Sequence, residues 1–156
     1  MSSRQILQRP AKCHCTSMRR AARAITKIYD HALAPSRLKA TQFALLMYIK
    51  GHGPLNISTL SRIMVLDRTT LVRNLKHLEK AGLIEDVPTS DPRERRIHIT
   101  LDGQRLVDIA LPLWKEVQKQ MANQIGRENL KILDTVVSIA ESAHLEHGEL
   151  AEGEEA

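Results

Sequence analysis

The 156-residue sequence predicts a mostly α-helical fold with one small β-hairpin. Apolar residues recur at intervals of three and four over most of the chain, which is the period of helices with one buried face. Only residues 83–88 and 95–99 have the pattern of short strands, and the turn-forming segment TSDPRE lies between them. Aromatic residues make up only 3% of the chain, so we expect a core of Leu, Ile, Val and Ala, as in helical proteins.

Residues 56–82 have the pattern of two helices joined by a tight turn. In the second helix Leu71, Leu75 and Leu78 recur at i, i+4 and i+7 and form one core-facing stripe. Asp67 is the expected N-cap, because its carboxylate can accept free backbone N–H groups, and Gly82 is the expected terminator.

The opposite face of this second helix is polar and cationic, which suits the base edges and phosphates of a DNA major groove. The residues expected to contact DNA from this helix are Arg68, Thr69, Thr70, Arg73, Asn74, Lys76 and His77. A basic face alone is weak support, because helix surfaces exposed to solvent are commonly charged.

The hairpin directly after this helix makes the assignment more specific. A helix-turn-helix followed by a hairpin with basic residues at its tip is the pattern of a winged helix. Arg93 and Arg95 are the wing residues expected to contact DNA, and Asp91 is expected to brace the wing arginines.

Four further helices are predicted around this unit. The first covers residues 13–33 and is stopped by Pro35, and the second begins at an N-cap on Thr41 and runs to residue 50. A long helix from an N-cap at Thr100 to about residue 123 contains Pro112, and a last helix covers about 127–146. Residues 1–12 are expected to form a flexible arm, and residues 148–156 a disordered acidic tail.

These segments resemble the MarR (multiple-antibiotic-resistance-type) family of transcription regulators over about residues 13–145. The resemblance rests on LDRTTLVRNLKHLEKAGLI, on the D-x-R motif that begins at Asp91, and on I-T-x-x-G at residues 99–103. The last motif matches the family's L-T-x-x-G, with Ile99 in the leucine position.

The resemblance implies a single domain over residues 13–147, with a winged helix-turn-helix at about 41–100. It also implies that helices at about 13–34 and 102–146 pair two copies into a homodimer. The apolar stripe over residues 130–143, which has no obvious partner within one chain, agrees with this arrangement. Such a dimer would bind palindromic double-stranded DNA of roughly 16–20 base pairs, because its two helices enter successive major grooves.

The resemblance further implies a repressor that is relieved by an effector, here an oxidant or a small lipophilic or phenolic molecule. Tyr29, Met47 and Trp114 are candidate walls of an effector pocket by residue type, although core packing accounts for them equally well.

Cys13-His14-Cys15 is the most unusual local feature of the sequence. Cys13 and Cys15 are candidate redox sensors, because neighbouring cations can lower the pKa of a thiol; the alternative is that both are small packing residues. The two cysteines could also form a zinc site with His144 and His147, but two exposed histidines are favoured, and neither metal nor cofactor is expected.

Charge and composition place further bounds on function. The net charge is +5, no acid precedes Asp30, and no Lys or Arg follows Lys131, which is typical of a nucleic-acid binder with an acidic tail. No apolar run reaches membrane-spanning length, so the expected location is the cytoplasm. No nucleotide-binding or catalytic motif is present, and an enzyme is not expected.

Two other hypotheses remain open. The winged helix could be a protein-interaction module that does not bind DNA. A metal or redox protein without a DNA function would leave Arg73 and Arg93 unexplained.

Overall fold

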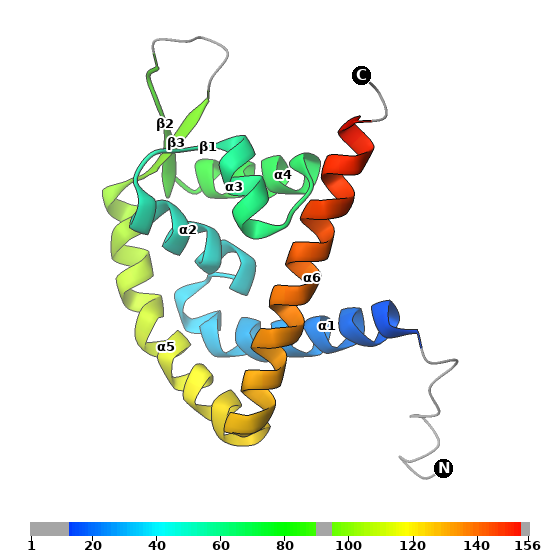
Figure 1. Cartoon of the computed structure of the whole chain (residues 1–156). Helices are drawn as coiled ribbons and strands as arrows, with labels where there is room; N and C mark the ends of the chain where they lie inside the picture. Colours follow the sequence, from blue (N-terminus) through cyan, green and yellow to red (C-terminus); the bar gives the residue numbers. More distant parts are fainter. Residues whose placement is uncertain (1–12, 90–94, 154–156) are drawn as a thin grey trace, which may run out of the picture.

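A computed structural model describes residues 13–89 and 95–153, and this part of the chain is mostly helical with a small antiparallel sheet, as predicted (Figure 1). The elements are α1 (His14–Leu33), the 3₁₀ helix η2 (Ala34–Ser36), α2 (Ala40–His52), β1 (Leu55–Asn56), α3 (Ile57–Met64), α4 (Arg68–Lys80), β2 (Ile84–Val87), β3 (Arg96–Ile99), α5 (Leu101–Ile125) and α6 (Arg127–Gly153). No helix in these residues is both long and apolar enough to span a membrane.

The sheet has one strand more than the sequence predicted. Strands β2 and β3 form the expected hairpin, with Ile84 opposite Ile99, while the two-residue strand β1 pairs with the other edge of β3 through Leu55 and Ile97. A strand of two residues is too short to show an alternating pattern, so the sequence alone does not reveal β1. It is recognised by its pairing with β3.

The start of α2 also differs from the prediction. The helix begins at Ala40 after an N-cap at Lys39, and Thr41 lies inside it. The N–H of Ala40 donates to Asp30 Oδ1 at 2.8 Å, and the N–H of Lys39 donates to Gln42 Oε1 at 2.9 Å. Asp30 belongs to α1, so the acid that satisfies this helix end comes from the preceding helix rather than from the local sequence.

The core lies between α2, α3, α4, the sheet and the first half of α5. Leu71, Leu75 and Leu78 are almost completely buried, which confirms the stripe predicted for α4. Further buried side chains are Leu33, Leu45, Leu46, Ile49, Leu60, Ile97 and Val107. Burial of the leucine stripe turns the opposite face of α4 outward.

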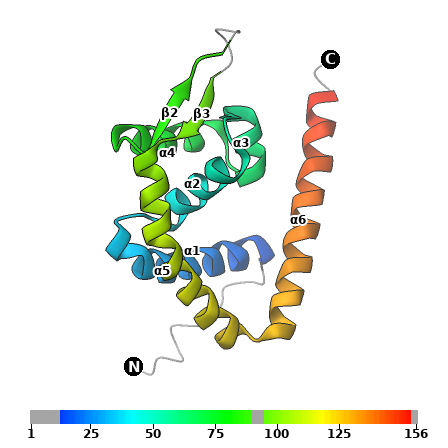
Figure 2. The ribbon, with the colours of Figure 1, turned by 90° about the vertical axis from the view of Figure 1, so that its left-hand side faces the viewer.

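Helix α6 stands apart from this core (Figures 1 and 2). It follows Gly126, whose positive φ of 81° turns the chain back after α5. Five of its large apolar side chains are exposed within the single chain, namely Ile132, Leu133, Val137, Ile139 and Leu145. The helix continues to Gly153, so it includes residues 148–153, which the sequence analysis assigned to a tail. The predicted arm at residues 1–12 lies outside the described residues.

The I-T-x-x-G segment joins α4, the wing and α5 at one point. The N–H of Thr100 donates to the Leu83 carbonyl at 3.1 Å, and its hydroxyl donates to the Gly82 carbonyl at 2.7 Å. The same hydroxyl oxygen accepts the N–H of Gly103 at 3.1 Å, so Thr100 is the N-cap of α5, as predicted. A Cβ atom on Gly103 would lie 2.1 Å from the Leu83 oxygen and 2.7 Å from Ile99 Cγ1.

From this close approach we predict that Gly103→Ala destabilises the fold. Alanine is favoured over glycine in a helix by about 1 kcal/mol. Here, however, the added methyl group collides with backbone, and we expect a net destabilisation of about 1–3 kcal/mol, as in other overpacked cores. Chemical denaturation measures the free energy of unfolding.

Gly51→Ala is the matched control, because Gly51 also lies in a helix but a Cβ there meets nothing within 4 Å. We expect this variant to be as stable as the wild type or more stable, by up to about 1 kcal/mol. Equal stability of Gly103→Ala and the wild type would show that the α4–α5 junction can open without cost.

Candidate nucleic-acid interface

Asp67 holds the start of α4 at the predicted N-cap position. Its Oδ1 accepts the N–H of Thr70 at 2.8 Å, and its Oδ2 accepts the Thr70 hydroxyl at 2.6 Å. The side-chain hydrogen bond from Thr70, followed by the backbone one, lowers the pKa of Asp67 below its ordinary value. The carboxylate therefore stays ionised where the helix dipole favours negative charge.

Local hydrogen bonds hold both the start of α3 and the turn before α4. The Asn56 side chain caps α3 by accepting the N–H of Thr59 at 2.7 Å, and the Ser61 hydroxyl donates to the Leu66 carbonyl. Val65 has a φ of 48°, which is uncommon for a β-branched residue and lets the chain reverse within three residues. The two helices and this turn form the predicted helix-turn-helix.

The outward face of α4 carries most of the residues predicted to contact DNA. At 100° per residue, Thr69, Arg73 and Lys76 lie opposite the buried leucines, with His77 beside them and Arg68 at the edge. All five are exposed. Thr70 and Asn74 are half-buried and bonded within the helix, since the Asn74 amide donates to the Thr70 carbonyl at 3.0 Å.

The wing projects on the same side of the molecule as α4 and on the side opposite α1 (Figure 1). Arg95, predicted to contact DNA, lies between two acids. Its Nε is 2.7 Å from Asp86 Oδ1 on β2, and its Nη2 contacts Glu79 Oε1 on α4. This half-buried guanidinium therefore fixes the wing against α4. Arg93 and the predicted brace Asp91 lie outside the described residues.

Cys13 and Cys15 are both free and exposed, so neither packs into the core of this chain. Cys13 is the N-cap residue of α1, and hydrogen bonds from the side chain and backbone of Thr16 lower the pKa of its thiol. Among the described residues, no three His, Cys, Asp or Glu side chains come together in a way that could hold a metal ion. The side chain of His147 is not among the described side chains.

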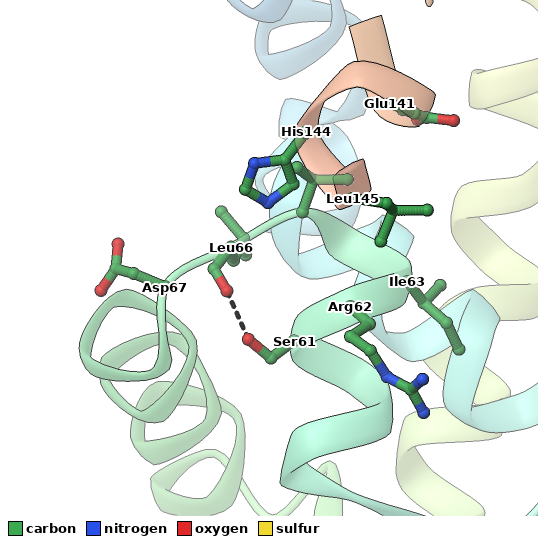
Figure 3. Close-up of a pocket in the computed structure, with 9 residues that line it drawn as sticks. Ser61, Arg62, Ile63, Leu66, Asp67, Glu141, His144 and Leu145 are labelled. Carbon is green, nitrogen blue, oxygen red and sulfur yellow. Dashed lines mark hydrogen bonds between the residues drawn. The ribbon is translucent and has the colours of Figure 1, made fainter. Parts of the chain in front are cut away.

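A cavity of about 480 Å³ separates the turn before α4 from α6 (Figure 3). Its walls carry both signs of charge, from Arg62 and from the acids Asp67 and Glu141, and the imidazole ring of His144 is also in the lining. Ile63, Val65, Leu66 and Leu145 supply the apolar part of the lining. The side chains of Asp67 and Glu141 point in opposite directions in Figure 3.

A second cavity, of about 200 Å³, lies where α1, α2 and α5 meet. It brings together Tyr29, Met47 and Trp114, the three residues predicted as pocket walls from their type alone. Phe43 is also in the lining, and its ring centroid lies 6.1 Å from that of Trp114. The Tyr29 hydroxyl donates to Gln118 on α5, and burial raises the pKa of this phenol.

Several known proteins resemble this chain in sequence, in fold or in both. Residues 38–98 match the sequence model of the MarR family. The transcriptional regulator MosR of Mycobacterium tuberculosis, in a crystal structure with DNA, is 33% identical with a TM-score of 0.78, and the match covers 86% of this chain and 98% of MosR. The transcriptional repressor NicR of Pseudomonas putida is 25% identical over 74% of this chain and 75% of its own.

A more distant structure is that of BpsR from Bordetella bronchiseptica, whose DNA binding is regulated by 6-hydroxynicotinic acid. It is 18% identical with a TM-score of 0.73, and the match covers 85% of this chain and 99% of BpsR. At this identity the likeness concerns the fold alone. The MosR match spans nearly the whole of both chains and the family match covers the helix-turn-helix, so the chain belongs to the MarR family of transcription regulators.

Proposed function

We propose that this chain is a cytoplasmic, homodimeric repressor that binds palindromic double-stranded DNA and releases it when an effector binds. The observation that carries the proposal is the set of unpaired cations on the outward face of α4. Arg73 and Lys76 have no acidic partner among the described residues, whereas Lys50 and Arg95 are each paired with acids. Exposed cations without carboxylate partners are suited to a polyanion.

The geometry divides the contacts into two kinds. Arg73 projects from the centre of the outward face, so it can reach a guanine edge through two hydrogen bonds, while Thr69 lies one turn away. Lys76, His77 and Arg68 flank it and suit phosphates or further bases. Thr70 and Asn74 are bonded within the helix, and Arg93, which the sequence assigns to the loop between the two wing strands, would enter the neighbouring minor groove.

Homodimerisation is supported by the exposed apolar face of α6 and by charge. The exposed residues of α1 include Arg19, Arg20, Arg23 and Lys27 and no acid before Asp30, whereas α6 has no Lys or Arg after Lys131. A second copy would cover the apolar face and bring opposite charges together. Two α4 helices would then enter major grooves about 34 Å apart, on an operator of roughly 16–20 base pairs.

Two features support effector control. The cavity lined by Trp114 lies between α1, α2 and α5. Helices α1 and α5 belong to the proposed dimer region, whereas α2 packs against strand β3 of the wing. A small molecule regulates DNA binding by BpsR, a protein with the same fold. The exposed thiols of Cys13 and Cys15 offer a route for an oxidant.

The alternative is a winged-helix module that binds an acidic protein surface instead of DNA. A DNA-binding protein releases counterions from the duplex, so its affinity falls steeply as salt increases. A protein-interaction module would show weak binding to duplex DNA and no preference for any sequence.

The first prediction for this function concerns base reading. On an operator selected from a random DNA pool, Arg73→Ala should cost about 1–3 kcal/mol of binding free energy, and much less on unrelated duplex. Binding isotherms on both duplexes across a salt series measure the two losses. Arg127→Ala removes the same charge from the opposite end of the molecule and should bind like the wild type. Equal losses for Arg73→Ala on both duplexes would mean that α4 grips only the backbone.

The second prediction concerns the dimer. Ile139 is 64% exposed in the single chain, so Ile139→Glu should leave the fold intact but place a charge in the apolar interface. Sedimentation equilibrium should show a dimeric wild type and a folded monomer for this variant. The neighbouring substitution Ser138→Glu adds the same charge beside the apolar stripe and should remain dimeric. A monomeric wild type, or an unchanged dimer in Ile139→Glu, would refute dimerisation through α6.

The third prediction concerns the cysteines. A thiolate attacks hydrogen peroxide, releases hydroxide and becomes a sulfenic acid, which a thiol reductant reverses. Mild peroxide should therefore lower DNA affinity reversibly in the wild type. The Cys13→Ser, Cys15→Ser double variant should bind equally well with and without peroxide. A wild type that ignores peroxide would leave the small-molecule cavity as the regulatory site.

A further inference from the structure

Val65 combines a strained backbone with an exposed side chain. Its φ of 48° and ψ of 46° lie in the left-handed region, which a β-branched residue rarely adopts. The residue is nevertheless 50% exposed, so packing within this chain does not offset the strain. Asparagine or glycine would suit this turn better if the backbone alone decided the residue. An exposed valine here therefore indicates a contact that the single chain does not contain.

The cavity between the turn before α4 and α6 is the place where such a contact fits (Figure 3). Its volume is about 480 Å³, and Val65 lies in its lining. Ile63 and Leu66 continue the apolar surface on the side of the turn, and Leu145, which is 58% exposed, lines the cavity from α6. Exposed apolar groups that gather in one place mark a surface for another molecule.

The apolar surface of α6 is wider than one contact requires. At 100° per residue, apolar side chains cover about 160° of this helix, namely Ile132, Leu133, Val136, Val137 and Ile139. A stripe of about 100° is enough for a helix that packs on one surface. Leu145 lies about 80° beyond Val137, on the side of the cavity. Helix α6 thus offers apolar surface to a neighbour on its broad face and also on its cavity side.

Twofold symmetry determines which part of a second copy reaches this cavity. In a twofold contact the same surface of both subunits meets, so a helix that crosses its symmetry mate does so at equal residues. Helix α6 borders the cavity with residues 141–145. A crossing at this height brings the same residues of the partner's α6 into the cavity.

The charges on the two walls agree with this arrangement. Arg62 near the end of α3 and Glu141 on α6 are both exposed, and neither forms an ion pair within the described part of the chain. Figure 3 shows them on different walls of the cavity. A second copy supplies the acid that Arg62 lacks and the cation that Glu141 lacks, and such complementary charges select the partner.

We propose that residues 62–66, at the end of α3 and in the turn before α4, are a docking surface for α6 of a second copy. Val65 packs against the partner's Leu145, and Arg62 pairs with the partner's Glu141. The inference rests on the proposed function, since it requires the dimer. It adds a contact through which each subunit holds the turn that precedes its partner's reading helix.

Val65→Asn separates docking from turn formation. Asparagine accepts the left-handed backbone, so the turn itself is not weakened. The dissociation constant of the dimer should nevertheless rise on the order of tenfold in sedimentation equilibrium, because a buried valine contributes about that much. Leu101→Asn removes an apolar side chain at a residue that is 72% exposed at the start of α5, and should dimerise like the wild type. An unchanged dissociation constant for Val65→Asn would overturn the inference.

An exchange of charges between two chains tests the ion pair across subunits. Arg62→Glu and Glu141→Arg should each weaken self-association, because each variant brings like charges together. A mixed dimer of the two variants restores both ion pairs with reversed sign. Native mass spectrometry should therefore show mixed dimers well above the half that random pairing of equal amounts gives. Random pairing would overturn the inference, and it is the result expected if the two residues pair within one chain or if the cavity holds a small ligand.

These outcomes are distinct from a failure of the proposed function. If the wild type dimerises but Val65→Asn behaves like its control and the charge variants pair at random, dimerisation through α6 stands and the contact with the turn is refuted. A preference for mixed dimers in a protein that binds no DNA would refute the repressor and support the docking surface. A monomeric wild type would refute both.

Discussion

The close approach of Gly103 to the Leu83 carbonyl is the contact on which the arrangement of α4, the wing and α5 depends. Thr100 donates to the carbonyls of Gly82 and Leu83, which directly follow α4, and its hydroxyl also caps α5. The end of α4, the end of the wing and the start of α5 therefore meet at one hydrogen-bonded point. Since only a residue without a side chain fits at Gly103, this point sets the direction of α4 relative to α5.

Features with a local cause could be predicted from the sequence. The leucine stripe of α4 was visible because its members lie one turn apart on the same helix. The caps at Asp67 and Thr100 were visible because each acts on an N–H three residues later. The winged helix followed from these local features and from the turn-forming segment between two short strands.

Features that depend on distant residues could not be predicted in this way. Arg95 looks like any other wing cation until the fold brings Glu79 and Asp86 beside it. The cap that Asp30 provides for α2 crosses from one helix to the next, and β1 exists only because β3 offers it an edge. The cavity at Trp114 could be guessed from residue types, but its volume and its lack of charge required the packed helices.

Helix α5 runs from the cavity that Trp114 lines to the junction with the end of α4 at Gly103. Trp114 and Gly103 lie eleven residues apart on this helix, a distance of about 16 Å at 1.5 Å per residue. A tilt of about 5° around Trp114 would therefore carry the Gly103 junction, and α4 with it, sideways by about 1.5 Å. Hydrogen bonds to base edges tolerate only about 0.5 Å of variation in length. Under the proposed function, a ligand that tilts α5 by this amount would take α4 out of register with the bases.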